Sequence, residues 1–566
     1  MLRLLTLSAA IVAVSGPACA DPRPAADTFP VTIAVDAGDP GRPVDPVWRF
    51  FGADEANYAT MKDGRSTLAT LGALSPDHVY FRTHNLLTSG DGTPALKWGS
   101  TGIYSEDRDG RPVYDWTVVD RIFDTYRARG VKPYVELGFM PEALSTRPLP
   151  YQHDWRPGSG SLRTGWAYPP RDYARWEELI HQWVLHCIAR YGRADVASWY
   201  FETWNEANLP QYYWGGTRDQ FFRLHDAAVR GVRRALPEAR VGGPDSAGAG
   251  DDFLTAFMAH AQAAGTPTDF LSFHAKGKPE VIADANGSHV RMGLNTHLKA
   301  ADHEFAAIAA NPAFRTKPII IGESDPEGCA ACQGPANAYR NGTMYSSYTA
   351  ASFPRLLALA GRRGLDLEGI LSWAFEFEDQ PPFAGFRQLT SNGIDLPVMN
   401  VFKMFAKMNG QYVPAISDHQ AALDTVMRDG VRGAADVGSI ATLNGASLAV
   451  LVWHYHDDDQ AGPTASVKLR LHRLPRPFSA GVVLTQYRID PRHSNSFAAW
   501  KDMGSPLAPT DAQRAVLLKA GALASIETDP ARLSKDGRDA ELTFTLPRQG
   551  VSLLVMTPMS SPATHR

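Results

Sequence analysis

The sequence predicts an α/β protein, a (β/α)8 TIM barrel followed by a C-terminal antiparallel β-sandwich. Between residues 48 and 375, short β-rich runs alternate with amphipathic stretches of helical period. Eight such alternations fit within about 350 residues, as a closed barrel of parallel strands requires. Beyond about residue 405 the apolar period changes to two residues, which is typical of antiparallel strands.

Composition excludes several classes of protein. The chain has 566 residues, of which 44% are hydrophobic and 20% charged, with a formal net charge of −4. These values are ordinary for a globular protein and unlike those of disordered, collagen-like or coiled-coil chains. The balanced charge gives no reason to expect a nucleic-acid or membrane partner. Four cysteines are too few for a disulfide scaffold. The sequence does not predict an oligomeric state.

The first twenty residues have the pattern of a signal peptide. Arg3 precedes an apolar run over residues 4–14, and Ala18-Cys19-Ala20 forms a small-x-small cleavage site. A membrane anchor is the alternative, but the apolar run is too short to span a bilayer. We therefore expect cleavage after Ala20, a secreted or periplasmic protein, and a linker over residues 21–29.

The predicted barrel covers residues 46–405. Its eight strands are expected at residues 48–53, 78–83, 132–138, 198–204, 240–244, 269–274, 318–322 and 369–375. A doubly wound open sheet is the rival explanation of the alternation. No glycine-rich phosphate loop follows the first strand, which disfavours a nucleotide-binding version of that fold.

Two helices have the clearest signals. Residues 172–191 have apolar side chains at helical spacing, and Gly192 stands where a C-terminal cap belongs. A second helix is expected to begin at Thr217, because Thr217 and Gln220 have the spacing of a capping box.

Residues 406–566 are predicted to form the β-sandwich. Its strands are expected at residues 448–453, 467–471, 482–489, 541–546 and 551–556. The N-terminal segment 30–45 contains an alternating run, Val31 to Val35, and we expect this strand to join the sandwich.

Two carboxylates end predicted barrel strands. Glu206 follows the fourth strand and Glu323 ends the seventh. Active sites of such barrels form at this carboxyl-terminal face, and these two strand ends face each other across the ring. Glycoside hydrolysis needs such a pair, with one carboxyl group protonated and the other ionised. We therefore predict that Glu206 and Glu323 are catalytic.

Other candidate substrate-binding residues lie at or near strand ends. Asn205 could hydrogen-bond a sugar 2-hydroxyl, and Trp373 could stack on a sugar face. Lys276 would place a cation near the substrate or the nucleophile. Some of these residues have a structural alternative. His84 and His274 could be hydrogen-bonded structural histidines, Arg82 a buried arginine that orients a catalytic glutamate, and Lys276 a solvated loop lysine. The full set is Arg82, His84, Phe139, Asn205, His274, Lys276, Trp373 and Glu378.

The motifs resemble glycoside hydrolase family 39. Phe201 to Leu209, followed by Tyr213-Trp214, is similar to the acid/base segment of that family, and Phe81 to His84, Phe139 to Leu144 and Val241 to Pro244 are similar too. The resemblance covers residues 48–405. The Asn-Glu pair alone is shared by the wider clan of retaining barrel glycosidases, whereas the combination is more specific.

The family contains β-xylosidases and α-L-iduronidases. The resemblance implies a retaining mechanism with Glu206 as the general acid/base and Glu323 as the nucleophile. It favours an exo-acting enzyme similar to a bacterial β-xylosidase, which releases xylose from xylo-oligosaccharides. The sequence departs from the family pattern at Ser324-Asp325-Pro326, at Ala275-Lys276-Gly277 and in the shifted position of Glu378, all around the sugar pocket. An arabinofuranoside, a uronic acid or an exopolysaccharide is the alternative substrate. A glycan-binding barrel without activity and a metal-dependent hydrolase are alternative functions.

The predicted reaction needs no cofactor or metal. Cys329 and Cys332 form a C-x-x-C pair, but the further ligands of a zinc site are missing. We expect a local disulfide in the loop after the seventh strand. Cys187 lies on the apolar face of its helix and is expected to be an unpaired core residue.

Overall fold

The computed structural model describes residues 27–559 except 76–77, 154, 158–161, 249, 286, 446 and 529. The predicted signal peptide and most of the predicted linker lie outside these residues. Eight strands close into a barrel in the order β12-β13-β2-β3-β6-β7-β8-β9, and every neighbouring pair is parallel. The predicted barrel is therefore confirmed, and the open sheet was the wrong alternative. The strands are β2 (Phe50–Gly52), β3 (Val79–Thr83), β6 (Val131–Leu137), β7 (Tyr200–Thr203), β8 (Arg240–Ser246), β9 (Phe270–Lys276), β12 (Ile319–Asp325) and β13 (Leu367–Ser372).

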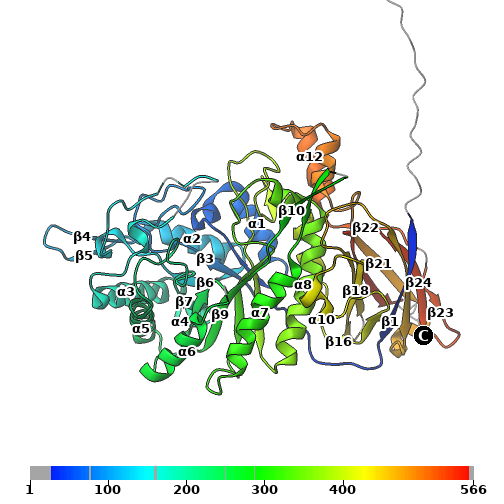
Figure 1. Cartoon of the computed structure of the whole chain (residues 1–566), viewed down its shortest axis with the longest axis horizontal. Coiled ribbons are helices and arrows are strands. Elements are labelled where there is room, and N and C mark those ends of the chain that lie inside the picture. Colours follow the sequence, from blue (N-terminus) through cyan, green and yellow to red (C-terminus); the bar gives the residue numbers. More distant parts are fainter. Residues whose placement is uncertain are drawn as a thin grey trace, which may run out of the picture.

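Helices surround the barrel (Figure 1). α3 ends before Gly192, as predicted, and begins after Asp172, whose side chain caps the helix. α5 begins after Thr217, and both hydrogen bonds of the capping box with Gln220 are present. The helices are α1 (Lys62–Gly72), α2 (Thr117–Ala128), α3 (Tyr173–Tyr191), α4 (Arg193–Val196), α5 (Arg218–Ala235), α6 (Phe253–Ala264), α7 (Leu294–Ala309), α8 (Thr343–Arg362) and α9 (Pro397–Phe405).

The loops of the barrel contain short hairpins and 3-10 helices. They are the hairpins β4 (Tyr104–Glu106) with β5 (Pro112–Tyr114), β10 (Glu280–Asp284) with β11 (Gly287–Arg291), and β14 (Thr390–Ser391) with β15 (Ile394–Asp395). The 3-10 helices are η1 (Ala56–Thr60), η2 (Glu142–Leu144), η3 (Gly165–Ala167) and η4 (Pro335–Asn341).

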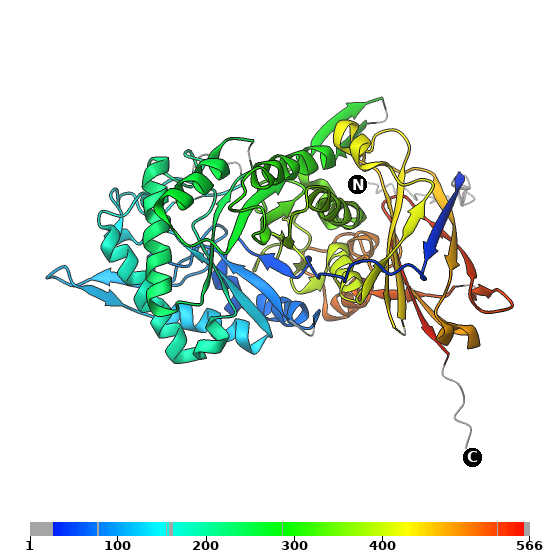
Figure 2. The same ribbon diagram turned by 90° about the horizontal axis from the view of Figure 1, so that it is seen from below.

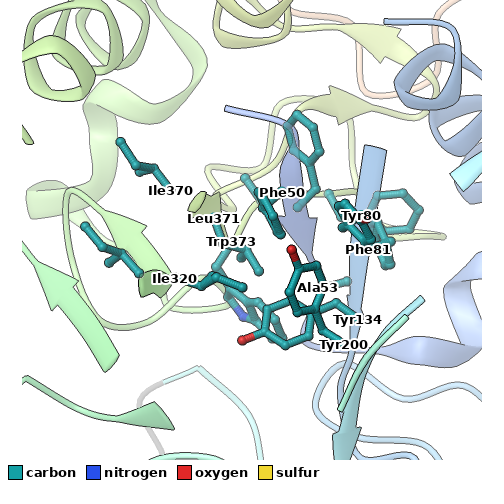
Figure 3. Packing of buried hydrophobic residues seen from close by; sticks show 14 of the residues in the cluster. Phe50, Ala53, Tyr80, Phe81, Tyr134, Tyr200, Ile320, Ile370, Leu371 and Trp373 are labelled. Carbon is teal, nitrogen blue, oxygen red and sulfur yellow. The ribbon is translucent and has the colours of Figure 1, made fainter. Parts of the chain in front are cut away.

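An aromatic layer fills the barrel interior near the amino ends of the strands (Figure 3). Phe50 stacks on Tyr80 with ring centroids 5.0 Å apart, and Tyr80 meets Tyr200 at 4.9 Å. Tyr134 and Phe270 complete the layer from β6 and β9. These rings come from five of the eight strands and form a packed core layer, as expected for the interior of such a barrel.

The second domain is a β-sandwich of two sheets. One sheet has the order β17-β1-β20-β24-β23 and the other β16-β18-β19-β25-β21-β22. The strands are β1 (Thr28–Asp36), β16 (Gln411–Val413), β17 (Ala415–Ser417), β18 (Asp436–Asn444), β19 (Ser447–Tyr455), β20 (Thr464–His472), β21 (Val482–Ile489), β22 (Ala524–Ile526), β23 (Arg532–Leu533), β24 (Ala540–Leu546) and β25 (Val551–Pro558). Its remaining helices are α10 (Leu423–Asp429), η5 (Arg476–Ala480), α11 (Ser496–Asp502) and α12 (Asp511–Gly521).

The N-terminal strand β1 lies among strands from the other end of the chain. It pairs parallel with β20 and antiparallel with β17. Figure 2 shows β1, drawn in blue, beside the C-terminal strands. The parallel pairing departs from the predicted antiparallel sandwich. The strand also begins at Thr28, within the predicted linker 21–29 and before the predicted segment 30–45, because its pairing with β20 extends to Thr464.

The helices α11 and α12 interrupt a region for which only strands were predicted. They pack against the barrel, where Phe383 lies 5.0 Å from the ring of Trp500. The two domains also meet through a buried ion pair, 2.8 Å between Arg355 of α8 and Asp436 of β18. The sandwich is therefore fastened to the barrel by apolar and ionic contacts. Among the described residues, no helix combines the length and apolar character needed to cross a membrane.

Candidate active site

Arg82 is the centre of a buried ionic cluster inside the barrel. Its guanidinium on β3 is completely buried and pairs with Glu136 of β6 at 2.9 Å, with Glu202 of β7 and with Asp245 of β8. It also lies 3.3 Å from Glu323 of β12. A buried charge is costly unless it is paired, so this cluster fixes the side chains from four other strands around one cation.

The two predicted catalytic carboxylates meet at His274. Its Nδ1 lies 2.8 Å from Glu206 Oε1 and 3.9 Å from Glu323 Oε2. These two oxygens are therefore at most about 6.7 Å apart. Side-chain exposure is 13% for Glu206 and 7% for Glu323, so both carboxyl groups are mostly buried but keep some accessible surface. The limit excludes a carboxylate separation near 9 Å, at the upper end of the range for inverting glycosidases.

Three cations surround Glu323. Burial works against its ionisation, but the charges of Lys276, His274 and Arg82 hold the pKa of this carboxyl group well below its usual range. Lys276 Nζ donates directly to Glu323 Oε2 and also to Asp325 Oδ2 at 2.8 Å. Glu323 is therefore held as a carboxylate at neutral pH.

His274 is held in its charged form. Burial lowers its pKa, but the charge of Asp245, followed by that of Glu323, raises the pKa of His274 to about 10. Its Nε2 donates to Asp245 Oδ2 at 2.7 Å. A protonated imidazole can donate from both nitrogens, so His274 also donates to Glu206 and orients that carboxyl group.

Backbone strain is concentrated at the strand ends that carry this cluster. Trp204, Glu206 and Asp245 have φ angles of 71°, 44° and 52°, and Asn85 has 45°. These left-handed conformations are costly for residues other than glycine and persist where the surroundings hold them. The turn after β7 thereby points Glu206 toward His274.

Aromatic rings and histidine form the wall of the cluster. His84 contacts Glu136 at 2.6 Å, and its ring meets the edges of Phe139 and Trp373 at 5.1 Å each. The guanidinium of Arg82 lies 5.0 Å from the ring of Trp373. These three predicted residues are thus brought to the site, where they are buried by packing against one another.

Asn205 and Glu378 have different positions. Asn205 Oδ1 accepts a hydrogen bond from Arg82 at 3.1 Å, which places it within the cluster. Glu378 is not brought to the cluster. It instead accepts from the backbone N–H of Gly64 at 2.6 Å, in the first turn of α1. A carboxylate there satisfies a free helical N–H group, so Glu378 is a helix-capping residue in this structure.

Several site residues were not predicted. Glu136 and Glu202 each stand two residues after an aromatic residue of the inner layer, Tyr134 and Tyr200. Because side chains two residues apart on a strand face the same side, this spacing could have indicated that both glutamates point into the barrel. Asp245 had no such signal, since the register of β8 shifts after Pro244.

A second ionic group lies behind Trp373. The indole N–H donates to Asp54 at 2.7 Å, and Lys97 pairs with the same carboxylate at 2.6 Å. Asp54 follows β2, whereas Lys97 belongs to the long loop after β3. No local sequence pattern links these two residues, so only the folded chain identifies the pair.

The loop after β12 contains the predicted disulfide, Cys329–Cys332, with an S–S distance of 1.99 Å. Cys187 is free and buried, also as predicted. Within the described part of the chain, no group of three or more His, Cys, Asp or Glu side chains has a metal-binding arrangement.

A barrel whose mouth brings together an ionised carboxylate and a second carboxyl group has the arrangement that glycoside hydrolases use. Comparison with known proteins agrees with this class. The model of glycosyl hydrolases family 39 matches residues 31–537, and the chain belongs to that family.

Relatives with two different activities are similar to the chain. A β-xylosidase of Geobacillus stearothermophilus is 27% identical over 444 residues, which cover 76% of this chain and 77% of the relative. The human α-L-iduronidase is 24% identical over 560 residues, or 90% and 77% of the two chains. The crystal structure of the GH39 enzyme from Xanthomonas axonopodis pv. citri is 25% identical and covers 95% of this chain and 99% of its own, with a TM-score of 0.73.

Proposed function

We propose that the protein is a retaining exo-glycosidase that releases β-D-xylose from the ends of xylo-oligosaccharides. The placement of His274 between Glu206 and Glu323 is the observation that carries the proposal. Glu323 attacks the anomeric carbon while Glu206 gives its proton to the leaving oxygen, and a glycosyl–Glu323 ester forms. Glu206 then takes a proton from water, which attacks the same carbon and releases Glu323.

The geometry supports this division of roles between Glu206 and Glu323. Glu323 is ionised by Lys276, His274 and Arg82, as a nucleophile must be. Glu206 is held by one charged histidine and is more exposed, so leaving group and water can reach it. The β-xylosidase relatives support xylose as the sugar.

A glycoside of a uronic acid is the second candidate substrate. Lys276 is a mostly buried cation that contacts the nucleophile Glu323, and Arg387 lies on the other side of Asp325; a sugar carboxylate would need a cation such as Lys276. Three α-L-iduronidase relatives, from mouse, dog and human, match 86%, 87% and 90% of this chain, against 76% and 73% for two β-xylosidases.

Initial rates on p-nitrophenyl β-D-xylopyranoside and on a fluorogenic α-L-iduronide would choose between the sugars. Glu206→Gln and Glu323→Gln should each lower kcat/KM at least about a hundredfold on whichever substrate is cleaved. Glu304→Gln is the matched control, because Glu304 is a buried carboxyl group on α7, outside the site. Release of iduronate without xylose would overturn the xylosidase proposal.

The stereochemistry of the first product tests the mechanism. Proton NMR during the first minutes of hydrolysis should show xylose released as the β-anomer, because two displacements restore the configuration. The α-anomer would contradict the covalent intermediate on Glu323.

We also propose that the protein is exported. The pattern of the first twenty residues supports cleavage after Ala20. N-terminal sequencing of the protein purified from its own host should then begin at Asp21, and an intact Met1 would contradict export by this route.

A further inference from the structure

The loop that follows the nucleophile strand is folded around one arginine. Arg340 of η4 is almost completely buried. It donates to the backbone carbonyls of Cys329 at 2.6 Å and of Ala330 at 3.1 Å, and to that of Cys332. The disulfide closes the turn that carries these three carbonyls. The rigid fork of a guanidinium can bind several acceptors at once, so the bridged turn and Arg340 form one unit, here called the disulfide loop.

The disulfide loop holds a second buried arginine. Arg340 Nη2 pairs with Glu327 Oε1 at 2.6 Å, and Arg387 donates to the same carboxylate oxygen. The backbone N–H of Arg387 donates to the carbonyl of Ala330 at 3.0 Å. Arg387 is therefore fixed by the loop through both its backbone and its side chain.

Charges of alternating sign then connect Arg387 to the nucleophile. Arg387 Nη2 lies 3.3 Å from Asp325 Oδ2, and Lys276 Nζ lies 2.8 Å from the same oxygen. Lys276 in turn donates to Glu323. Arg387 and Asp325 are completely buried, so water screens these contacts little.

We propose that the disulfide loop is a positioning unit for the nucleophile: through Arg340, Glu327 and Arg387 it holds Asp325, and Asp325 keeps Lys276 against Glu323. The inference rests on the proposed role of Glu323 as nucleophile. It gives Cys329, Cys332 and Arg340 a part in the reaction although none of them contacts Glu323 in the described structure.

The charge on Glu323 is the property that should respond. If the loop loosens, Lys276 moves away from Glu323, and the pKa of Glu323 rises toward its ordinary value. The acidic limb of the pH profile of kcat/KM, which reports the ionisation of groups in the free enzyme, then moves to higher pH. The other titratable groups that face the nucleophile are unchanged by the variants below: Arg82 from β3, Glu206 and Tyr213 from the segment after β7, Asp245 from β8, and His274 from β9.

Two variants test the unit at different points. The double variant Cys329→Ser with Cys332→Ser removes the bridge, and Arg340→Lys removes the fork while it keeps the charge. Both should move the acidic limb upward by about half a pH unit or more, and kcat should fall more than KM changes. Cys187→Ser is the matched control, because this buried cysteine lies on α3, away from the loop. Its profile should equal that of the wild type.

Combining the double-serine change with Arg340→Lys shows whether the two changes act on the nucleophile through the same contacts or independently. Because both act through Arg387, the combined variant should shift the limb little more than either one alone. An unchanged limb in the folded double-serine variant would overturn the proposal, as would additive shifts. If the double-serine protein fails to fold, the acidic limb of the pH profile of Arg340→Lys tests the proposal alone, and an unchanged limb would overturn it.

A readout without turnover separates this inference from the proposed function. In protein labelled with 13C at glutamate carboxyl carbons, the Glu323 signal is the one missing from Glu323→Gln. Its titration should move to higher pH in both variants. This shift in a protein that cleaves no glycoside would support the positioning unit and overturn the proposed function alone. An unmoved titration in folded variants would overturn the positioning unit.

Discussion

The barrel interior contains two layers of side chains that differ in kind although the same strands supply them. Tyr80 and Arg82 are two residues apart on β3, as are Tyr134 and Glu136 on β6. The first residue of each pair lies in the aromatic layer of Figure 3 and the second in the ionic cluster around Arg82. Two residues along a strand, about 6.6 Å, therefore separate a layer that stabilises the fold from one that performs chemistry.

The two layers differ in what they contribute to the free energy of folding. Stacked rings gain free energy from burial and from ring contacts. Buried ion pairs often gain little over well-packed apolar residues, because each charge loses its hydration. The ionic layer, not the aromatic one, surrounds Glu206 and Glu323. Changes in the ionic layer should therefore abolish activity, whereas changes in the aromatic layer should affect stability alone.

Replacement of Arg82 should have the largest effect, because its guanidinium is the centre of the ionic layer. Arg82→Met leaves Glu136, Glu202 and Asp245 without their shared cation, so the free energy of unfolding should fall by at least about 3–5 kcal/mol. Activity should be lost as well. Urea unfolding at pH 7 measures the first effect. A variant as stable as the wild type would show that the cluster does not depend on the arginine.

The ionic layer should also give the protein a pH-dependent stability. The pKa of His274 is raised from its ordinary 6.5 to about 10 in the folded protein. The stabilisation from its charge is therefore complete below pH 6.5 and is lost as pH rises through 10. Unfolding midpoints measured between pH 6.5 and 10 should decline in the wild type and decline less in His274→Gln.

His297 supplies the control for that experiment. Burial lowers the pKa of this histidine to about 3, so it is neutral in both folded and unfolded protein above pH 6.5. His297→Gln should keep the slope of the wild type. Equal slopes for all three proteins would refute the charged state assigned to His274.

The aromatic layer should respond in stability alone. Phe50→Leu removes the ring contacts with Tyr80 and Tyr200 but keeps an apolar side chain, so the loss should be about 1–2 kcal/mol. The kcat/KM of the folded enzyme should stay within about twofold of the wild type. A large fall in kcat/KM would mean that the two layers are not functionally separate.

The smallest effect is expected from removing the hydroxyl group of Tyr134, which links the aromatic layer to the ionic layer. Tyr134 donates to Glu202 Oε2 at 2.7 Å, and Tyr134→Phe should reduce the free energy of unfolding by about 1 kcal/mol. Tyr126→Phe is the control, because the buried Tyr126 hydroxyl has no hydrogen-bond partner among the described residues. Tyr126→Phe should lower the free energy of unfolding less than Tyr134→Phe does, as measured by urea unfolding. A larger loss in Tyr126→Phe would contradict a stabilising hydrogen bond from Tyr134 to Glu202.

Local patterns predicted much of this molecule. The alternation of strands and helices gave the eight barrel strands, while Gly192 marked the end of one helix and the capping-box residue Thr217 the start of another. Glu206 and Glu323 could be identified because each stands at a strand end, and parallel strands place their carboxyl ends at one face. The disulfide could be predicted because its two cysteines are three residues apart.

Long-range contacts decided the remainder. The sequence determined where the strands end and that Glu206 and Glu323 stand at two of those ends, because strand period is a local property. It did not determine which of them pair. Glu378 lies near the eighth strand end yet turns to α1, and Asp245 becomes a partner of Arg82 through a register shift. The charges of His274 and Glu323 depend on neighbours from four strands, since a pKa reflects burial and nearby charge in three dimensions.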